Sequence, residues 1–434
     1  MRPFSLSATL AVATCLVSAQ AQAPKIDLAI QAGRLIDGVS ASPRGQTTIL
    51  VGGERIVAVQ DGWQLPAGAR VIDLRASTVL PGFIDAHTHI TGEGTGNAIV
   101  RTATETPLDD AVRSTAYAKR TLEAGFTTIR NLGAAGGADI ALRSAIQAGL
   151  VPGPRIWTAR TTLSITGGHG DDTNGMRPDV WKAPTWEDGI VDSADEARKA
   201  VRHQHKLGAD LIKITATGGV LSIGDSGDAQ QFTDDEMKAI VEAAHLLGMK
   251  VAAHAHGKRG IDAAIRAGVD SIEHGTYGDD ESFRLYKERG TYLVPTILAG
   301  KTVAEMATIP GHFHPTVQAK AERIGPLMQD MFRRAYKAGV KIAFGTDSGV
   351  SNHGENAREF VYMAEAGMPA MEAILSATRA GADLIGAADR IGSIQSGRFA
   401  DVVAVAGNPL TDVSELRRVT FVMKGGAVYK NTVK

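Results

Sequence analysis

The sequence contains one cysteine, Cys15, among its 434 residues. If a mature chain lacks Cys15, it can form no disulfide and can use no thiolate in catalysis. The sequence also lacks a dominant charge, because 46 basic and 47 acidic residues give a formal net charge of -1. No long run of either sign indicates a polyanionic partner, so we expect no binding to nucleic acid.

The sequence beyond its N-terminal segment has no uninterrupted apolar run near the roughly 18 residues of a membrane span. The N-terminal segment itself has Arg2, an apolar stretch over 4–17 and the Ala-x-Ala patterns of 18–23. These features predict a bacterial-type signal peptide over residues 1–23, with a buried helix or a lipoprotein signal as alternatives. The mature protein is then expected to be soluble, without a membrane partner, and periplasmic or secreted.

Short alternating strands separated by glycine turns occur at both ends of the chain. They occupy about 26–80 near the N-terminus and 401–429 near the C-terminus. Neither group is large enough to form a core alone, so we expect the two groups to pair. The prediction is one small β-sandwich domain built from residues 24–80 and 392–434.

The intervening residues 81–391 alternate apolar strand patterns with helical patterns such as 109–124, 138–148 and 234–247. Eight strands are expected, one ending near His87 and the others over 126–131, 155–159, 211–215, 251–256, 271–275, 291–296 and 342–347. An α/β fold containing a (β/α)8 TIM barrel is the predicted architecture. An open doubly wound sheet is the alternative, although no Gly-x-Gly-x-x-Gly follows the first strand.

Several predicted strands end in a residue that can ligate a metal, and active sites of such barrels lie at this end. They end in His87 and His89, which project to the same side of one strand, and in His254, His274 and Asp347. A structural role is the simpler interpretation of any one histidine, but not of the whole set. Imidazoles with a carboxylate suit Zn²⁺ or a similar divalent ion.

Lys213 lies in the predicted strand 211–215 and is the unusual member of this set. A protonated amine would be repelled by a cationic metal site. Carboxylation by CO₂ would turn the side chain into a carboxylate analogue that can bridge two metal ions. The alternative is a lysine that reaches solvent at the strand end, and the residues alone favour that alternative.

The motifs together resemble the amidohydrolase superfamily. They are the segment 83–89 (Phe-Ile-Asp-Ala-His-Thr-His), Lys213 in 213–219 (Lys-Ile-Thr-Ala-Thr-Gly-Gly), His254, His274 in Ile-Glu-His-Gly, and Asp347 in Phe-Gly-Thr-Asp-Ser. The resemblance is closest to the imidazolonepropionase-related branch, which includes Xaa-Pro and Xaa-Arg dipeptidases and ochratoxin-hydrolysing amidases. True imidazolonepropionases lack the bridging lysine, so Lys213 favours the binuclear peptidases.

The resemblance implies two divalent ions, most simply Zn²⁺, and a role for each residue. It places His87, His89 and Asp347 on one ion and His254 and His274 on the other, with N6-carboxylated Lys213 and a hydroxide as bridges. Asp347 would also be the catalytic proton carrier. The resemblance further implies a homo-oligomer, since oligomers are common among such proteins.

Substrate contacts are less defined by the sequence. His256 faces the same way as His254, so spacing cannot choose between them, and only the resemblance leaves His256 for the substrate. His169 in the glycine-rich segment 166–170 could also contact the substrate, or could be incidental. Arg160, Tyr277 and His353 are positional candidates for binding a substrate carboxylate.

Three functions are compatible with these patterns. The first is a dipeptidase or N-acyl amino acid amidase that acts on a small molecule and releases a C-terminal amino acid. The second is a hydrolase that opens cyclic amides. The third is a non-catalytic barrel scaffold, which would be expected to have lost ligands, whereas all six are present.

Overall fold

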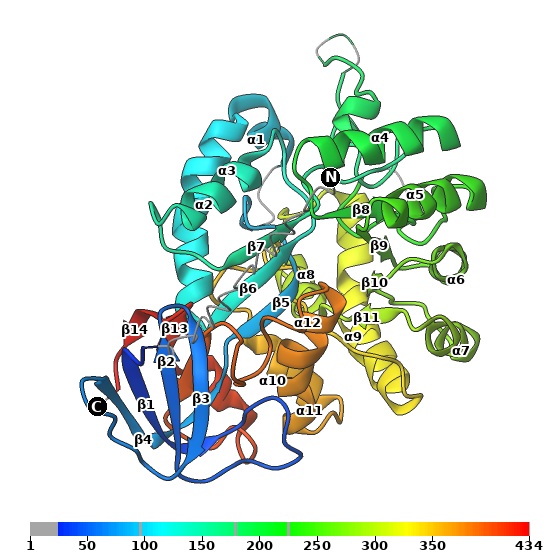
Figure 1. The fold of residues 1–434 in the computed structure, drawn as a ribbon. Helices are drawn as coiled ribbons and strands as arrows, with labels where there is room; N and C mark the ends of the chain where they lie inside the picture. The colour runs from blue at the N-terminus through cyan, green and yellow to red at the C-terminus, as the bar shows by residue number, and fades with distance from the viewer. Residues whose placement is uncertain (1–24, 95–97, 178, 180, 224–225, 434) are drawn as a thin grey trace, which may run out of the picture.

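The computed structural model describes residues 25–94, 98–177, 179, 181–223 and 226–433, so the predicted signal peptide lies outside the described residues. The fold is mixed α/β. A sheet with strands from both ends of the chain lies beside a larger region of parallel strands and helices (Figure 1).

The terminal strands form one seven-stranded sheet in the order β14-β13-β12-β4-β1-β2-β3. Their bounds are β1 Leu28–Leu35, β2 Thr47–Gly52, β3 Arg55–Asp61, β4 Arg70–Pro81, β12 Val402–Val405, β13 Val419–Lys424 and β14 Ala427–Asn431. The two ends of the chain meet at β4, which pairs with β1 in parallel and with β12 in antiparallel. Pairing lets the two groups share a buried apolar cluster that includes Ile30, Leu74 and Phe421.

The outer strand of this sheet, β3, is also hydrogen-bonded to the C-terminal segment. The Ile56 amide donates to the Arg398 carbonyl at 2.9 Å, and the Gly397 amide donates to the Ile56 carbonyl at 2.8 Å. The expected pairing of the chain ends is therefore present. The division into two facing layers, which a sandwich requires, stays a prediction.

The parallel strands form two sheets, β5-β6-β7 and β8-β9-β10-β11. Their bounds are β5 Phe83–Thr88, β6 Phe126–Asn131, β7 Arg155–Thr158, β8 Leu211–Thr215, β9 Lys250–Ala255, β10 Ser271–His274 and β11 Tyr292–Val294. A parallel bridge from Leu163 to Ile214 links the first sheet to the second. On the other side, bridges from Leu293 to Ile342 and from Thr88 to Ser348 link them through residues 342–348.

The expected strand 342–347 is not a regular strand in the structure. Its backbone is hydrogen-bonded to both neighbours, because the Ala343 amide donates to the Leu293 carbonyl and the Phe344 carbonyl accepts from Ala86. Asp347, however, has φ 58°, a left-handed conformation that ends an extended segment. The sequence pattern therefore predicted the position of residues 342–347 between their two neighbouring strands correctly, but the prediction that they form a regular strand was wrong.

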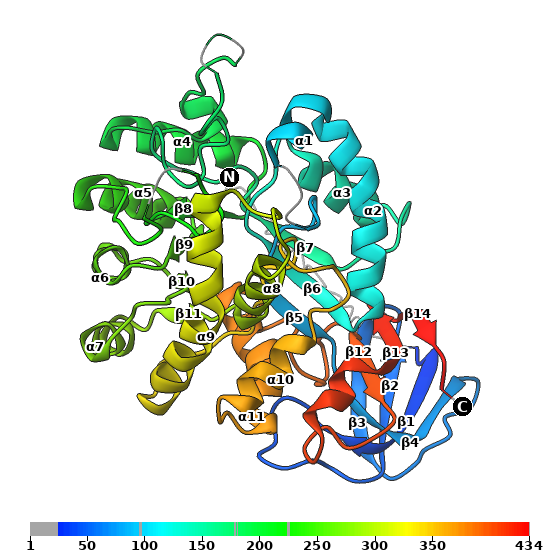
Figure 2. The ribbon, with the colours of Figure 1, turned by 180° about the vertical axis from the view of Figure 1, so that it is seen from behind.

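Helices follow the parallel strands and cover their outer side (Figures 1 and 2). Their bounds are α1 Ala98–Thr104, α2 Pro107–Glu123, α3 Ala138–Gln147, α4 Ala194–Lys206, α5 Asp234–Leu246, α6 Lys258–Ala267, α7 Asp280–Arg289, α8 Ile297–Ala307, α9 Pro315–Lys337, α10 Arg358–Glu365, α11 Ala370–Leu375 and α12 Gly381–Leu384. The sequence shows why two of them begin where they do. Thr106 with Asp109 and Thr233 with Glu236 form capping boxes that satisfy the first amides of α2 and α5. The expected helices 109–124, 138–148 and 234–247 are confirmed within two residues.

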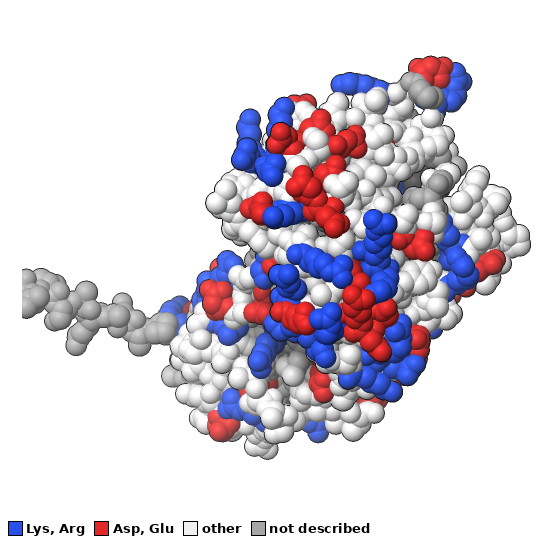
Figure 3. Space-filling view, turned by 90° about the vertical axis from the view of Figure 1, so that its right-hand side faces the viewer, with Lys and Arg blue, Asp and Glu red and all other residues white. Residues whose placement is uncertain are grey.

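The surface carries basic and acidic side chains interspersed on the face shown in Figure 3. Among the residues that the structure describes, no helix has both the length and the apolar character that a membrane span requires.

Candidate metal centre

A cavity of about 770 Å³ lies at the C-terminal ends of the parallel strands. The eight site residues expected from the sequence all line it, namely His87, His89, His169, Lys213, His254, His256, His274 and Asp347. Carboxyl ends of parallel strands meet at one edge, which explains how residues as far apart in sequence as His87 and Asp347 share a cavity.

The first group of possible ligands consists of His87, His89 and Asp347. Both histidines come from the end of β5, and their Nε2 atoms each lie 3.3 Å from Oδ1 of Asp347. The side chain of His87 is 1% exposed. Three ligand atoms therefore converge on one point, which is buried on the side of His87 and open to solvent on the side of His89, whose side chain is 36% exposed.

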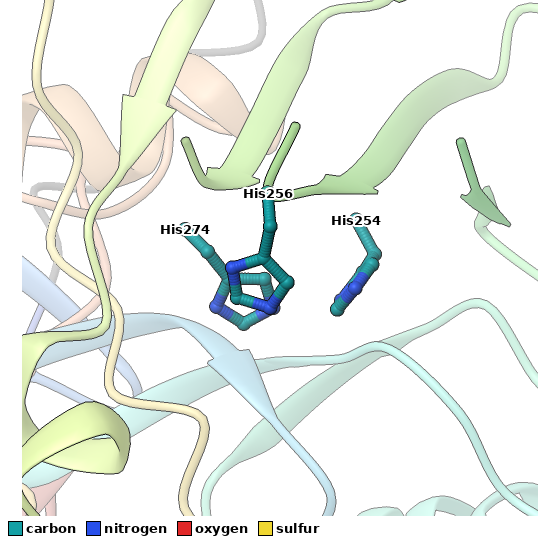
Figure 4. Close-up of side chains that lie close together, drawn as sticks. All are labelled: His254, His256 and His274. Atoms are coloured by element: carbon teal, nitrogen blue, oxygen red, sulfur yellow. The ribbon is translucent and has the colours of Figure 1, made fainter. Parts of the chain in front are cut away.

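The second group consists of His254, His256 and His274, whose ring nitrogens lie within 4.8 Å of one another. Figure 4 shows the ring of His254 to one side of the rings of His256 and His274, which overlap in this view. The rings of His256 and His274 are stacked, with centroids 4.8 Å apart and planes inclined by 16°. The structure thus leaves His256 in the same cluster as His254, as the alternation of the strand implies.

In each histidine of this second group, a hydrogen bond to one ring nitrogen fixes the orientation of the ring. Nδ1 of His274 lies 2.6 Å from Oγ1 of Thr296, and Nδ1 of His256 lies 2.7 Å from Oγ1 of Thr276. Nε2 of His254 donates to the Gly218 carbonyl at 3.1 Å. Such partners fix the tautomer of each ring and direct its other nitrogen, as they do for histidines that bind metal.

Backbone strain is concentrated at this cavity. In the described part of the chain, the non-glycine residues with positive φ are Arg160, His274, Thr296 and Asp347. Three of them line the cavity, and Thr296 contacts His274. A left-handed conformation is costly for most side chains and persists where the surroundings require it, often at functional sites.

Burial keeps the histidines neutral. It lowers the pKa of His87, His254 and His274 well below the usual value, and the charge of Lys213 adds to the effect. Burial lowers the pKa of His89 and of His256 to about 3. A neutral imidazole offers a lone pair, which is the form that a metal ion requires.

Lys213 and Asp347 are a buried pair of opposite character. Burial lowers the pKa of the Lys213 amine, although the carboxylates of Glu273 and Asp347 oppose the shift. Burial raises the pKa of the Asp347 carboxyl, and Lys213 opposes that shift. Both groups are therefore nearer to neutrality than their exposed counterparts, and an uncharged amine is the form that can react with CO₂.

The chemistry of the first group fits a cation. Nδ1 of His87 is 2.9 Å from Oε2 of Glu273, so its proton lies there and its Nε2 carries a lone pair. That lone pair faces Oδ1 of Asp347, which is buried and accepts no hydrogen bond among the described residues. Buried acceptors that face one another without a donor are unfavourable unless a cation lies between them.

A buried ion pair behind His87 was not expected from the sequence. Arg130 of β6 donates from Nη2 to Oε1 of Glu273 at 2.8 Å, and their side chains are 2% and 0% exposed. Glu273 also accepts from Ser271 and from His87. The motif Ile-Glu-His-Gly contained the only available signal, which is a carboxylate inside a short predicted strand, directly before a possible ligand. Glu273 thus holds the ring of His87, a position that tunes a ligand without touching the ion.

Replacing Glu273 with glutamine should lower the free energy of unfolding by about 3 to 5 kcal/mol, because it leaves the Arg130 charge buried without a counterion. Glu281→Gln is a matched control, since Glu281 pairs with Lys258 at 3.0 Å but is half exposed. That variant should lose about 1 kcal/mol or less. Urea denaturation measures the free energy of unfolding of both variants. Equal losses would show that the buried pair of Arg130 and Glu273 stabilises the protein no more than an exposed ion pair does.

The candidates for substrate contact differ in position. Arg160 lines the cavity, whereas Tyr277 and His353 are not among its lining residues. His353 donates from Nε2 to the Gly92 carbonyl at 2.7 Å and stacks on Tyr117. His169 lies over His254, with ring centroids 4.3 Å apart.

Comparison with known proteins places this site in a family context. The amidohydrolase family profile matches residues 78–429. An ochratoxinase of Aspergillus niger is 33% identical over 454 aligned residues, which cover 99% of this chain and 92% of that protein. An imidazolonepropionase of Symbiobacterium thermophilum is 26% identical over 430 residues, which cover 87% of this chain and 90% of that protein.

Solved structures agree with the sequence comparison. A Xaa-Pro dipeptidase with methionine bound in its active site has a TM-score of 0.90 and 47% identity, covering 93% of this chain and all of that chain. A prolidase in complex with N-methylphosphonate-L-proline has a TM-score of 0.86 and 34% identity, covering 93% of this chain and 99% of that chain. These neighbours imply a TIM-barrel fold for the parallel strands.

Proposed function

Since the chain belongs to the amidohydrolase family and is a hydrolase of amide bonds, we propose that it cleaves a dipeptide or an N-acyl amino acid and releases the C-terminal amino acid. The observation that carries this proposal is the pair of ligand groups on one cavity, with Lys213 lining the same space. Relatives named as an ochratoxinase and a Xaa-Pro dipeptidase support the choice of substrate.

Two divalent ions would be held by the residues of these groups, and the donor set suits Zn²⁺. His87, His89 and Asp347 would hold one ion, and His254 and His274 the other. Lys213, N6-carboxylated by CO₂, would be a ligand of both. When bound, such ions polarise an amide carbonyl and lower the pKa of a water to about 7.

Asp347 would move the proton. Its carboxyl is buried, and the raised pKa lets it hold a proton at a pH at which an exposed aspartate would not. It takes a proton from the attacking water and delivers it to the nitrogen of the leaving amino acid. His169 and His256 line the same cavity and would contact the polar groups of the substrate.

The wider organisation of the protein belongs to the same proposal. The parallel strands with residues 342–347 would form a (β/α)8 barrel over residues 81–391. Residues 24–80 and 392–434 would form a small β-sandwich. The sequence pattern of residues 1–23 supports export to the periplasm or beyond, and the family resemblance supports a homo-oligomer.

Amino-acid release from dipeptides and N-acyl amino acids tests the proposed reaction. Zinc-loaded protein should release the C-terminal amino acid from a panel that varies only at this residue, and chelation of the metal should abolish release. Release of the C-terminal amino acid from members of the panel would support the proposal, and the members that are cleaved would show which C-terminal residues the cavity accepts. If no member of the panel is cleaved by protein that holds two ions, the reaction is not this one. A cyclic amide, the ring type implied by the imidazolonepropionase relative, would then be the next substrate to test.

A further inference from the structure

The cavity has an apolar side. We define the apolar wall as Val220, Leu221, Val303, Ile324, Met328 and Val350, all of which line the cavity and share one hydrophobic cluster. Val303 belongs to α8, and Ile324 and Met328 belong to α9. None of these side chains can bind a carboxylate or an amine, so this side of the cavity favours an apolar group of a substrate.

The two helices of the apolar wall pack unusually closely. A Cβ on Gly300 of α8 would lie 2.5 Å from Sδ of Met328, and a Cβ on Gly325 of α9 would lie 2.9 Å from the Gly300 carbonyl oxygen. Glycine at 325 is therefore required for α8 and α9 to meet in this way, whereas a Cβ on Gly300 would displace the flexible side chain of Met328 and would lie 3.3 Å from Cα of Gly325. The apolar wall is thus fixed by backbone contact and does not depend on a bound ligand.

Arg160 lies at the cavity with a constrained backbone. Its φ is 61°, its amide donates to Oγ1 of Thr158 at 3.0 Å, and its carbonyl accepts from Ala134 at 2.7 Å. These contacts hold the Arg160 backbone in a conformation that is unfavourable for arginine, and they fix the position of its Cα and Cβ atoms at the cavity.

The guanidinium of Arg160 has a neutral partner. Its Nη1 donates to Oε1 of Gln204 at 3.3 Å, and no carboxylate of the described residues lies within salt-bridge distance of it. Lys182 also lines the cavity, but its side chain is exposed to solvent, whereas Arg160 is half-buried. A partly desolvated guanidinium without a counterion is suited to a bidentate carboxylate.

Arg160 and the part of the apolar wall on α8 lie on opposite sides of the centre, while Val220 and Leu221 of the wall follow β8, which neighbours the Arg160 side. The strand order runs β5, β6, β7, β8, β9, β10, β11 and residues 342–348, which return to β5. Arg160 follows β7, and α8 follows β11, which is four places away in either direction. The possible metal ligands lie at the ends of the strands between them, so a substrate that contacts both sides must cross the centre.

We propose that Arg160 binds the carboxylate of the leaving amino acid and that the apolar wall binds the acyl part, so that substrates with a large apolar acyl group are preferred. This inference rests on the proposed function and deepens it. It assigns the selectivity for size and polarity to the residue on the N-terminal side of the cleaved bond, while the C-terminal residue is recognised chiefly through its carboxylate.

The experiment compares Phe-Ala with Gly-Ala and Phe-Ala with its C-terminal amide, using zinc-loaded protein. Wild-type protein should cleave Phe-Ala with a kcat/KM about tenfold or more above that for Gly-Ala. Its KM for Phe-Ala should be about 10- to 100-fold below that for the amide, because only the free acid offers a charged partner to Arg160.

Two variants with matched controls separate the two contacts. Arg160→Met should raise KM for Phe-Ala about 10- to 100-fold and leave KM for the amide unchanged, while Arg202→Met at an exposed position of α4 should alter neither. Arg160→Lys should recover part of the loss, because it restores the charge but not the paired donors. Val303→Thr keeps the shape of the side chain and should lower kcat/KM for Phe-Ala about tenfold, with little effect on Gly-Ala. Val112→Thr on the exposed face of α2 is its control.

The outcomes distinguish this inference from the function on which it rests. Equal cleavage of the acid and the amide by wild-type protein, or equal effects of Arg160→Met on both, would overturn the role of Arg160. Equal cleavage of Phe-Ala and Gly-Ala would overturn the role of the apolar wall while amide hydrolysis stands. Failure to cleave any of these substrates with two ions bound would overturn the proposed reaction, and this inference with it.

Discussion

Asp347→Asn should lower kcat by about 10³-fold while the protein stays folded and keeps its cavity, because asparagine cannot accept and deliver the proton. The backbone should tolerate the change. Asp347 has φ 58°, and asparagine is among the few residues that adopt this left-handed conformation readily. Steady-state hydrolysis of a dipeptide from the panel, together with circular dichroism and metal analysis, measures the effect.

The metal analysis decides what a loss of turnover means. Asp347 is also a proposed ligand, so the variant supports the role of proton carrier only if kcat falls while two ions remain bound. Asp235→Asn, at an exposed position of α5, should leave kcat and metal content unchanged. Near-native turnover of Asp347→Asn would remove the residue from the chemistry, and a parallel loss of one ion would restrict it to the role of ligand.

Lys213→Ala should lower the bound metal from two ions per chain to one or fewer, and turnover should fall with it. The lysine is 3% exposed and lies near the five neutral histidines of the two ligand groups and near two buried carboxylates. If it is carboxylated, its loss removes a ligand from both ions, and such ligands must be present for the site to keep its metal. Metal content after gel filtration in metal-free buffer measures this directly.

Lys213→Arg is the matched control for the charge of this residue. Arginine keeps a positive charge and a long side chain, but it does not become a carboxylate analogue. If the role of Lys213 is to bridge two ions, the arginine variant should lose metal as the alanine variant does. If the lysine is instead a simple counterion of Asp347 and Glu273, the arginine variant should retain both metal and turnover.

The sequence located the possible ligands because their positions follow from local rules. Strand alternation places His87 and His89 on one side, and the ends of parallel strands meet at one edge of a sheet. The first rule acts over a few residues, and the second follows from the repeated alternation of strands and helices, so both can be applied without knowing the tertiary contacts. The regularity of 342–347 could not be read in this way, because the turn at Asp347 depends on its hydrogen bonds to β5.

The contacts behind the ligands required the tertiary structure. Arg130 and Glu273 are separated by 143 positions, and each in isolation resembles a charged residue of an ordinary strand. The two residues matter to the fold because they are buried together, and a buried charge is tolerated only beside its counterion. Sequence patterns report how a residue alternates along its strand, and they do not report which distant charge it meets.

The sequence by itself determined the family, the kind of reaction and the residues that can bind metal, since these depend on residue type at the ends of strands. Only the tertiary structure decided which side of the cavity is charged and which is apolar. Arg160 was one of three equal candidates until the structure placed it at the cavity and turned His353 toward Gly92. The apolar wall combines segments between residues 220 and 350, and such a surface exists only after long-range packing has brought them together.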